Sequence, residues 1–457
     1  MDNKRGFYFE TEKGNIYYYN DITGQVKSSK QKPKETICYG TEKYIPTQIK
    51  AEAVEKELEM RGYDQLTLIV TQGCNIRCKY CVYSGQYENS REHNNINMDF
   101  DTAKKALLLY FGYVKKKKMK IPLFVPEISF YGGEPLVNFE LIRQSVEFIK
   151  IIYDGKVDYN ITTNACLLDD EKIKFFAENK FILSISLNGN KNEHDRLRVF
   201  ANGEGTYEYA MSAIKKIRNI YPEYFKEFCY VIGVYDHGTD LEEIEEFFER
   251  EEILKDKLLL YVPVIDYGTR WYEQYSEEER KKFLNQYQQI KKKYIQNLKL
   301  GKKESQIQKA LFHMGDLQII NRPMNCTIQE VTNGLLPSFG ACIPGHKMAI
   351  DPYGVIHACE KVNDKMPLGT VDSGLDYGKI AKILEKYNNT MGEQCINCPI
   401  RRFCPHCYQA LLDGEGNFSL TKLKPCNFYI QARINQMIQT YDMLEAHVSP
   451  DTLLYGV

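Results

Sequence analysis

The chain has 457 residues, of which 43% are hydrophobic and 26% are charged, so it can bury a sizeable core and is not a disordered chain. With 60 Lys and Arg against 61 Asp and Glu, the formal net charge is -1, which argues against a general nucleic-acid binder. The beginning of the sequence shows no apolar stretch after a basic start, and no apolar run is long enough to span a bilayer. We therefore expect a cytoplasmic protein that binds neither nucleic acid nor membranes.

The 14 cysteines are numerous and clustered. In a large chain without an export signal, cysteines are more often metal ligands than disulfides. One group lies between residues 74 and 81 and a second between residues 326 and 426. Cys38, Cys166 and Cys229 stand apart from both groups, and we expect them to be small core residues.

The first part of the chain favours strands and turns. Short apolar and aromatic runs at residues 7–9, 16–19 and 24–26 are separated by segments that contain Gly, Asn and Asp, which suit turns. A short helix is expected over residues 51–61. We predict a small, strand-rich α+β module over residues 1–62.

Residues 65–270 alternate between strand and helix patterns. Six such units predict an α/β fold with a parallel sheet, either a partial barrel or a doubly wound sheet, with active residues at the carboxyl ends of the strands. Lysines 115–118 end the first of these helices, where cations suit the helix dipole. The predicted strands are 67–71, 127–131, 158–163, 182–187, 228–234 and 258–264, and the predicted helices are 99–116, 139–152, 170–178, 207–218 and 241–250.

A charged helix is expected within residues 271–305, with Ser276 and Glu279 as its capping box. From residue 326 onward, loops and cysteines dominate until a final helix over about 427–446. We therefore expect three consecutive domains: the first module, a core with its following helix over residues 63–305, and a Cys-rich domain over residues 306–457.

The loop after the first strand of the core contains Cys74, Cys78 and Cys81, with three and then two residues between them. Three thiolates cannot close a tetrahedral zinc site by themselves. They can hold three irons of a [4Fe–4S] cube and leave the fourth iron open to a substrate. A fragment of a zinc knuckle is the structural alternative.

This loop resembles the CxxxCxφC motif of the radical S-adenosylmethionine (SAM) enzymes, with Tyr80 at the aromatic position φ. The resemblance implies a partial (β/α)6 barrel. It also implies that Cys74, Cys78 and Cys81 bind the catalytic cluster and that SAM binds the open iron. One electron then cleaves SAM to methionine and a 5′-deoxyadenosyl radical, which abstracts a hydrogen atom from an unactivated carbon.

Later strand ends carry further elements of that family. Residues 131–135 match its GGE motif, where paired glycines let the backbone approach the methionyl amino group. Residues 194–198 resemble its HDxxR segment, so Arg198 either contacts SAM or forms a structural ion pair, and His194 is structural. Asn188 stands where many relatives carry Asp. The residues that the resemblance assigns to SAM are Tyr80, Gly132, Gly133, Glu134, Thr163, Asn164, Ser186 and Arg198.

The second group contains eight cysteines and resembles the SPASM extension of radical SAM enzymes, which carries two auxiliary [4Fe–4S] clusters. Residues 354–359 fit its GxxxxC element and residues 395–404 fit its CxxCxxxxxC element, although Cys407 follows after two residues instead of three. The resemblance assigns Cys395, Cys398, Cys404 and Cys426 to one cluster and Cys342, Cys359 and Cys407 to the other, with either Cys326 or an open iron completing it. One zinc ribbon formed by the two CxxC pairs is the alternative.

Residues 82–87 look like those of maturases that form sactionine or ranthionine thioethers in ribosomally made peptides. The resemblance implies a Cys-rich precursor peptide with a leader as substrate, a flavodoxin- or ferredoxin-type reductant, and SAM with three [4Fe–4S] clusters as cofactors. The first module either binds the leader as an added strand or only caps the barrel. One alternative is a formylglycine-generating sulfatase maturase, with Glu360 in place of the Asp base of such enzymes. The other is a metal-binding scaffold without turnover.

Overall fold

The computed structural model describes residues 4–46, 48–88, 92–255, 257–362, 364–421, 423 and 425–455. The chain forms two compact units, each assembled from stretches that are far apart in the sequence. We call Ala51–Gln286 with Pro344–Ile380 the barrel unit, and Met1–Lys50 with Tyr287–Ile343 and Ala381–Val457 the cysteine unit. The division into three consecutive domains, residues 1–62, 63–305 and 306–457, stays a prediction.

The barrel unit contains six parallel strands that follow one another in the sheet in sequence order, without a reversal. A doubly wound sheet would reverse its strand order, so this topology is that of a partial barrel. The α/β fold predicted from the sequence is confirmed. The strands are β5 (Gln65–Thr71), β6 (Glu127–Gly132), β7 (Asp158–Thr163), β8 (Ile182–Ser186), β9 (Cys229–Tyr235) and β10 (Leu259–Pro263).

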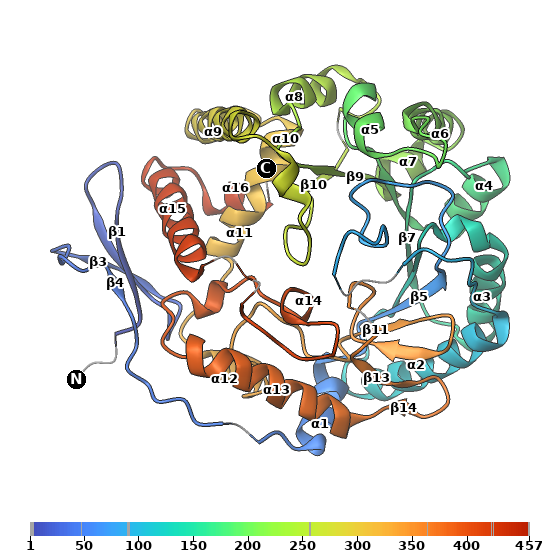
Figure 1. Ribbon diagram of the computed structural model, residues 1–457, viewed down its shortest axis with the longest axis horizontal. Helices are drawn as coiled ribbons and strands as arrows, with labels where there is room; N and C mark the ends of the chain where they lie inside the picture. Colours follow the sequence, from blue (N-terminus) through green and yellow to red (C-terminus); the bar gives the residue numbers. More distant parts are fainter. Residues whose placement is uncertain are drawn as a thin grey trace. The chain divides into compact units, whose positions relative to one another are not determined.

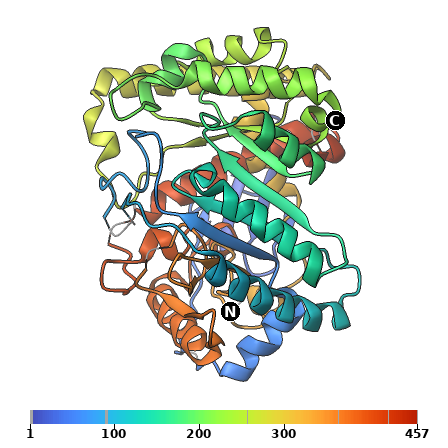
Figure 2. The same ribbon diagram turned by 90° about the vertical axis from the view of Figure 1, so that its right-hand side faces the viewer.

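The connecting helices lie outside the strands (Figures 1 and 2). Aspartates cap several of them as expected: Asp99 accepts a hydrogen bond from the Thr102 N–H at 2.7 Å at the start of the first helix. The predicted helices are observed as α2 (Phe100–Lys120), α3 (Phe139–Ile152), α4 (Asp170–Glu178), α6 (Tyr207–Ile220) and α8 (Leu241–Arg250), after α1 (Ala51–Arg61). The sequence analysis missed α5 (Lys191–Leu197) and α7 (Pro222–Phe228), which are less than three turns long.

The same sheet continues past β5 into a segment that we expected to be loops. Strand β11 (Lys347–Ile350) pairs parallel with β5, and β12 (Val355–His357), β13 (Pro367–Thr370) and β14 (Gly374–Leu375) follow antiparallel. These strands have two to four residues, which is too short for a periodic pattern to identify them. Cys359 and Glu360 come directly after β12 and therefore belong to the barrel unit.

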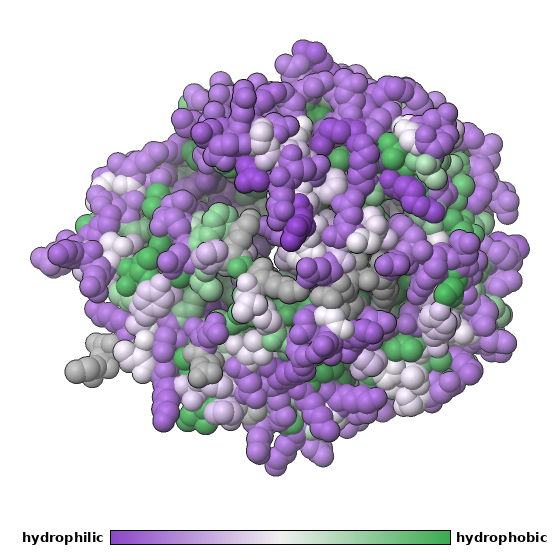
Figure 3. Space-filling view, viewed as in Figure 1, coloured by the Kyte–Doolittle hydropathy of each residue, from purple (hydrophilic) through white to green (hydrophobic). Residues whose placement is uncertain are grey.

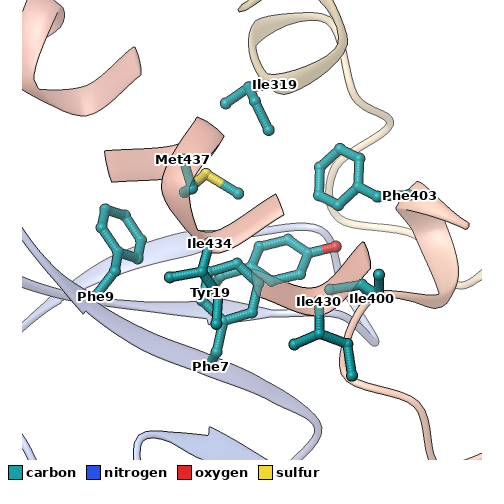
Figure 4. Close-up of a cluster of buried hydrophobic side chains, with 9 residues drawn as sticks. All are labelled: Phe7, Phe9, Tyr19, Ile319, Ile400, Phe403, Ile430, Ile434 and Met437. Atoms are coloured by element: carbon teal, nitrogen blue, oxygen red, sulfur yellow. The ribbon is translucent and has the colours of Figure 1, made fainter. Parts of the chain in front are cut away.

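The cysteine unit contains an antiparallel sheet of β1 (Gly6–Glu10), β2 (Ile16–Asn20), β3 (Val26–Ser29) and β4 (Ile37–Cys38), in the order β3-β2-β1-β4. Phe7, Phe9 and Tyr19 point from this sheet onto a helix near the end of the chain, α15 (Cys426–Glu445), as Figure 4 shows. Burial of these aromatic rings contributes roughly 2 kcal/mol each. The first two predicted strands are thus present, the third lies later than predicted, and β4 was missed. One face of the sheet is covered by the Cys-rich part of the chain.

A buried ion pair supports this contact. Arg5 Nε donates to Asp21 Oδ2 at 3.2 Å, and both side chains are at most 5% exposed. The Asp21 Oδ1 atom accepts from the Tyr19 hydroxyl and from the Arg402 backbone N–H, each at 3.1 Å. Burial raises the pKa of Asp21, while Arg5 opposes that shift.

The remaining helices include α9 (Glu277–Lys299), whose predicted capping box is confirmed: the Glu279 N–H donates to Ser276 Oγ at 3.2 Å. The helix predicted over about 427–446 is observed as α15, but it is not the final one, because the short α16 follows it. The sequence analysis missed α13 (Tyr377–Cys395), a helix of 19 residues. The other helices of this part of the chain are α10 (Gln306–Gln308), α11 (Met314–Ile320), α12 (Ile328–Thr332), α14 (Tyr408–Leu411) and α16 (Pro450–Tyr455).

Among the described residues, none of the helices combines the length and the apolar character that crossing a membrane requires. Hydrophilic side chains predominate on the face drawn in Figure 3, with apolar ones scattered between them.

Candidate active site

The loop with the first three cysteines begins where β5 ends, and backbone hydrogen bonds hold it. The Gly73 N–H donates to Thr71 Oγ1 at 3.0 Å, and the N–H groups of Arg77 and Lys79 donate to carbonyls at residues 199 and 197, at 2.6 and 2.9 Å. Burial raises the pKa of the Cys74 thiol to about 12 and that of the Cys81 thiol to about 11. The charge of Cys78 contributes to both shifts, so the three sulfurs lie near one another.

The GGE segment packs directly against this loop. The Gly133 N–H donates to the Thr71 carbonyl at 3.1 Å, and the Glu134 N–H donates to the Gly73 carbonyl at 2.9 Å. A Cβ atom on Gly133 would lie 2.2 Å from the Gly73 carbonyl oxygen and 3.1 Å from Cys74 Cβ. Only glycine permits this approach, so the motif fixes the backbone next to Cys74.

The Glu134 carboxylate joins two strand ends. It is 2% exposed, and it accepts from the Thr163 hydroxyl at 2.7 Å and from the Asn164 N–H at 2.8 Å. Burial raises the pKa of Glu134, and these hydrogen bonds oppose that shift. We predicted Glu134 and Thr163 as SAM contacts; their observed bonds are to each other, and direct contact with SAM stays a prediction.

Asn164 connects β7 to the cysteine loop. Its Nδ2 atom donates to Asn75 Oδ1 at 2.8 Å and lies 3.9 Å from Cys74 Sγ. The predicted residues Tyr80, Gly133 and Asn164 are therefore brought to one edge of the sheet with the three cysteines.

Arg198 is 9% exposed and donates to the Tyr80 hydroxyl, and its Nε atom is buried without a hydrogen-bond partner in the described part of the chain. Burial acts to lower the pKa of Arg198, but the charges of Cys78 and Tyr80 outweigh it and raise the pKa. The structure contains no carboxylate ion pair for Arg198 among the described residues. A buried guanidinium with a free donor suits a carboxylate ligand.

His194 positions Arg198. Its ring accepts from the Asn188 N–H at Nδ1 (3.4 Å), so the proton lies on Nε2, which is 2.9 Å from Thr206 Oγ1. The Thr206 hydroxyl donates to the Arg198 carbonyl at 3.1 Å. Burial lowers the pKa of His194 well below its usual value, so the ring is neutral, in agreement with the structural role expected for it.

The carboxyl end of β8 offers two further polar groups. Ser186 is 6% exposed at this position, and the Nδ2 atom of Asn188 is buried without a partner in the described residues. Unpaired buried donors are costly, which points to a ligand acceptor at this edge of the sheet.

Sequence reasoning missed an aromatic cluster beside Tyr80. Trp271 and Tyr275 follow β10 and pack with Leu197 and Val264, and Tyr80 lies against this cluster. The loop after Cys81 is bonded to the same region, because the Glu88 N–H donates to the Gly268 carbonyl at 2.6 Å. The signal available in the sequence was that Trp271 is the single tryptophan.

In the cysteine unit, four of the predicted ligands line one cavity of about 150 Å³: Cys395, Cys398, Cys404 and Cys426. Burial raises the pKa of Cys395 and Cys398 to about 12 and that of Cys404 to about 11, and the charge of Cys404 adds to the first two shifts. Apolar side chains such as Met391, Ile400 and Leu420 make up much of the remaining wall.

Cys342 and Cys407 of the same unit lie near one residue, Tyr408. The Tyr408 hydroxyl donates to the Cys342 carbonyl at 2.8 Å, and both thiols add to the rise in its pKa that burial causes. Cys326 lies in the cysteine unit, and its carbonyl accepts from Arg402. Cys359 lies in the barrel unit, so its assignment to a cluster with Cys342 and Cys407 stays a prediction.

Among the described residues, no three His, Cys, Asp or Glu side chains are grouped closely enough to hold a single metal ion. The ligands of an iron–sulfur cube sit on different irons, so their sulfurs lie farther apart than those around one ion. The cysteines on the loop and around the cavity thus offer sulfur ligands for a cluster, although they do not have the geometry of a site for a single metal ion.

Comparison with known proteins identifies part of the chain. Residues 68–250 match the model of the Radical SAM superfamily. This match covers less than half of the chain. It contains the cysteine loop, the GGE segment and Arg198, so these predicted site residues lie within the matched residues.

The relatives of the chain include enzymes with different products. It is 29% identical to a cysteine-type anaerobic sulfatase-maturating enzyme of Clostridium novyi over 45% of the chain, which is 52% of that enzyme. The match thus spans about half the length of this relative. The chain is also 22% identical to the radical SAM cyclopropyl synthase TigE of Paramaledivibacter caminithermalis, over 80% of the chain and 72% of that protein.

Among solved structures, the chain resembles native anSMEcpe with bound AdoMet and Cp18Cys peptide. The TM-score is 0.59 at 19% identity, and the match covers 84% of this chain and 99% of that one. This likeness shows the fold.

Proposed function

We propose that the protein is a radical SAM maturase that forms thioether cross-links between cysteine sulfurs and carbons of a Cys-rich precursor peptide. The observation that carries the proposal is that the chain has two kinds of cysteine site. One is a loop with three cysteines next to buried donors that have no partner among the described residues, and the other is a cavity lined by four cysteines. The first arrangement suits a reactive cluster and the second an electron-transfer cluster. The similarity to a sulfatase maturase and to a cyclopropyl synthase supports a radical reaction that modifies the substrate.

The residues present fit SAM and a [4Fe–4S] cluster. Cys74, Cys78 and Cys81 would hold three irons, and when bound, the cluster and SAM supply a carbon radical that abstracts hydrogen. The unpaired Nε donor of Arg198 would meet a carboxylate, and Gly133 lets the GGE segment lie directly against the cysteine loop. Tyr80, with the cluster of Trp271 and Tyr275, excludes water from this end of the barrel.

The two auxiliary clusters complete the proposal. Cys395, Cys398, Cys404 and Cys426 would hold one in the apolar cavity, where it would supply electron transfer. Cys342, Cys359 and Cys407, with Cys326 or an open position, would hold the other and take the peptide thiolate. A flavodoxin- or ferredoxin-type protein supplies the electron that starts each turnover.

The antiparallel sheet of residues 6–38 is the proposed binding site of the leader. A strand can be added only at an edge of this sheet, where backbone N–H and C=O groups are not paired to a neighbouring strand. Strand β3 forms one edge, and its Lys27 and Ser28 side chains are exposed. A leader that pairs with β3 would extend the sheet to five strands.

Co-expression with short Cys-rich peptides encoded next to the gene tests the proposal. Each thioether removes two hydrogen atoms, so mass spectrometry should show a loss of about 2 Da per cross-link and cysteines that resist alkylation. The Cys74→Ala variant is the control for product made without SAM cleavage. An unmodified peptide alongside active SAM cleavage contradicts the thioether proposal.

A second candidate is formylglycine formation on a sulfatase, which the match to the Clostridium novyi enzyme favours. Glu360 follows Cys359 in the barrel unit. Tyr131 stands directly before the two glycines of the GGE motif. Burial raises the pKa of Tyr131, and the charges of Tyr83 and then Glu360 add to this rise. A carboxylate near the GGE segment suits a base for a substrate thiol or hydroxyl. An aldehyde on a sulfatase-derived peptide, detected by hydrazide labelling, would establish this function in place of the first.

A further inference from the structure

His93 lies against the cysteine loop because its own segment is bonded to the end of β5. The Gln72 N–H donates to the Ile96 carbonyl at 2.9 Å, and the Met98 N–H donates to the Val70 carbonyl at 2.9 Å. An antiparallel bridge joins Thr71 and Asn97. The segment therefore runs back along the strand that leads into the cysteine loop, and it brings His93 beside Cys81.

Two contacts fix His93 at this position. Its backbone N–H donates to the Tyr83 carbonyl at 3.3 Å, and its Nε2 atom lies 3.6 Å from Cys81 Sγ. The Tyr83 N–H also donates to Cys81 Sγ, at 3.4 Å. Cys81 is thus approached by one ring nitrogen and one backbone nitrogen.

The tautomer of His93 follows from the sulfur that its ring faces. If the ring carried a proton on Nδ1 alone, the Nε2 lone pair would face a cluster-bound thiolate, which is repulsive. A proton on Nε2 points at the sulfur instead.

We infer that His93 is a positioning residue that donates an Nε2–H···S hydrogen bond to the Cys81 thiolate and so makes the first cluster easier to reduce. Donors to ligand sulfurs withdraw negative charge from a cluster and stabilise its reduced, more negative state. This inference rests on the first cluster of the proposed function and not on the identity of the peptide.

The test is a redox titration of the anaerobically reconstituted full-length protein, followed by electron paramagnetic resonance. The signal of the first cluster is the one that changes when SAM is added. His93→Ala and His93→Leu, which lack the donor, should shift its midpoint potential to a more negative value. His93→Gln, whose side-chain amide keeps an N–H, should stay close to the parent. Asn95→Ala, at an exposed position in the same segment, is the matched control.

Unchanged potentials in His93→Ala and His93→Leu would overturn the inference, and so would a His93→Gln variant that behaves like His93→Leu. If His93→Ala does not take up iron, the comparison of His93→Leu with His93→Gln decides. A parent protein with no SAM-responsive signal would overturn both proposals. A parent that shows this signal but modifies no peptide would overturn only the proposed function.

Discussion

The two groups of cysteines differ in how the chain presents them. Cys74, Cys78 and Cys81 lie on one short loop at a strand end, where unpaired donors of Arg198 and Asn188 are buried. The four around the cavity come from a longer stretch, residues 395–426, and apolar side chains surround them. The loop thus offers groups for a polar ligand, while the cavity offers four thiols and a largely apolar wall.

This difference suggests a division of labour. A site that binds a charged ligand must keep hydrogen-bonding groups unsatisfied until the ligand arrives. A site that only stores an electron gains from complete ligation and a dry surrounding, which set its potential. The variants below separate these roles.

Replacing one cysteine of each group should have the largest effect. Cys74→Ala should reduce SAM cleavage to background, because it removes a ligand of the reactive cluster, whereas Cys395→Ala should leave SAM cleavage intact and abolish peptide product. Deoxyadenosine release and product mass are the two measurements. Iron content is the control, and each variant should retain the clusters whose ligands are unchanged. Equal loss of SAM cleavage in both variants would contradict the division.

Asp21→Ala should destabilise the cysteine unit by about 3–5 kcal/mol, because it leaves the buried Arg5 guanidinium without its carboxylate. Hydrogen exchange of β1 and β2 is the measurement. Asp21→Asn, which keeps the hydrogen-bond acceptor at Oδ1, should cost less. Since the barrel unit does not contain this pair, its hydrogen exchange should be unaffected, and a uniform change in both units would contradict the expectation.

The two units also differ in how far the sequence predicted them. In the barrel unit, β7, α3, α4 and α8 begin and end at the predicted residues, because each carries its own local pattern, and α4 and α8 also follow a capping aspartate. The exceptions are β11 to β14, which are short and owe their conformation to pairing with β5 and with one another. A local pattern cannot show a pairing partner that lies hundreds of residues away.

The cysteine unit was harder to predict because distant stretches assemble it. The packing of Phe7 and Tyr19 against α15 joins the two ends of the chain, and no local signal indicates it. At the candidate site, the spacing of the cysteines and the resemblance to radical SAM motifs predicted the cysteine loop and the GGE segment. The contacts of His93 and Trp271 could not be predicted, since loops bring these side chains to the site.

Gly133→Ala should distort the cysteine loop, since the new Cβ would lie 2.2 Å from the Gly73 carbonyl oxygen. Such overpacking costs roughly 1–3 kcal/mol, and we expect SAM affinity to fall about tenfold or more. Quenching of Trp271 fluorescence by SAM measures the affinity, because this is the single tryptophan and it packs near Tyr80. Gly112→Ala, in α2 with no atom near its Cβ, is the matched control and should leave affinity unchanged.

The smallest expected effect concerns the pH dependence of the barrel unit. Burial holds the pKa of His194 well below 6.5, so below that pH the unfolded chain binds a proton that the folded chain does not. The stability that depends on this ring is therefore present above pH 6.5 and is lost as the pH falls, by up to about 1.4 kcal/mol per pH unit. His194→Gln should reduce this slope, to which the lowered pKa values of His93 and His346 in the same unit also contribute, and His447→Gln, at an exposed histidine, should keep it. Denaturant unfolding followed by Trp271 fluorescence reports the barrel unit alone, because the tryptophan lies there. An unchanged slope in His194→Gln would show that other groups cause it. The neutral His194 ring in the hydrogen-bond chain from Asn188 through Thr206 to Arg198 would then need another explanation.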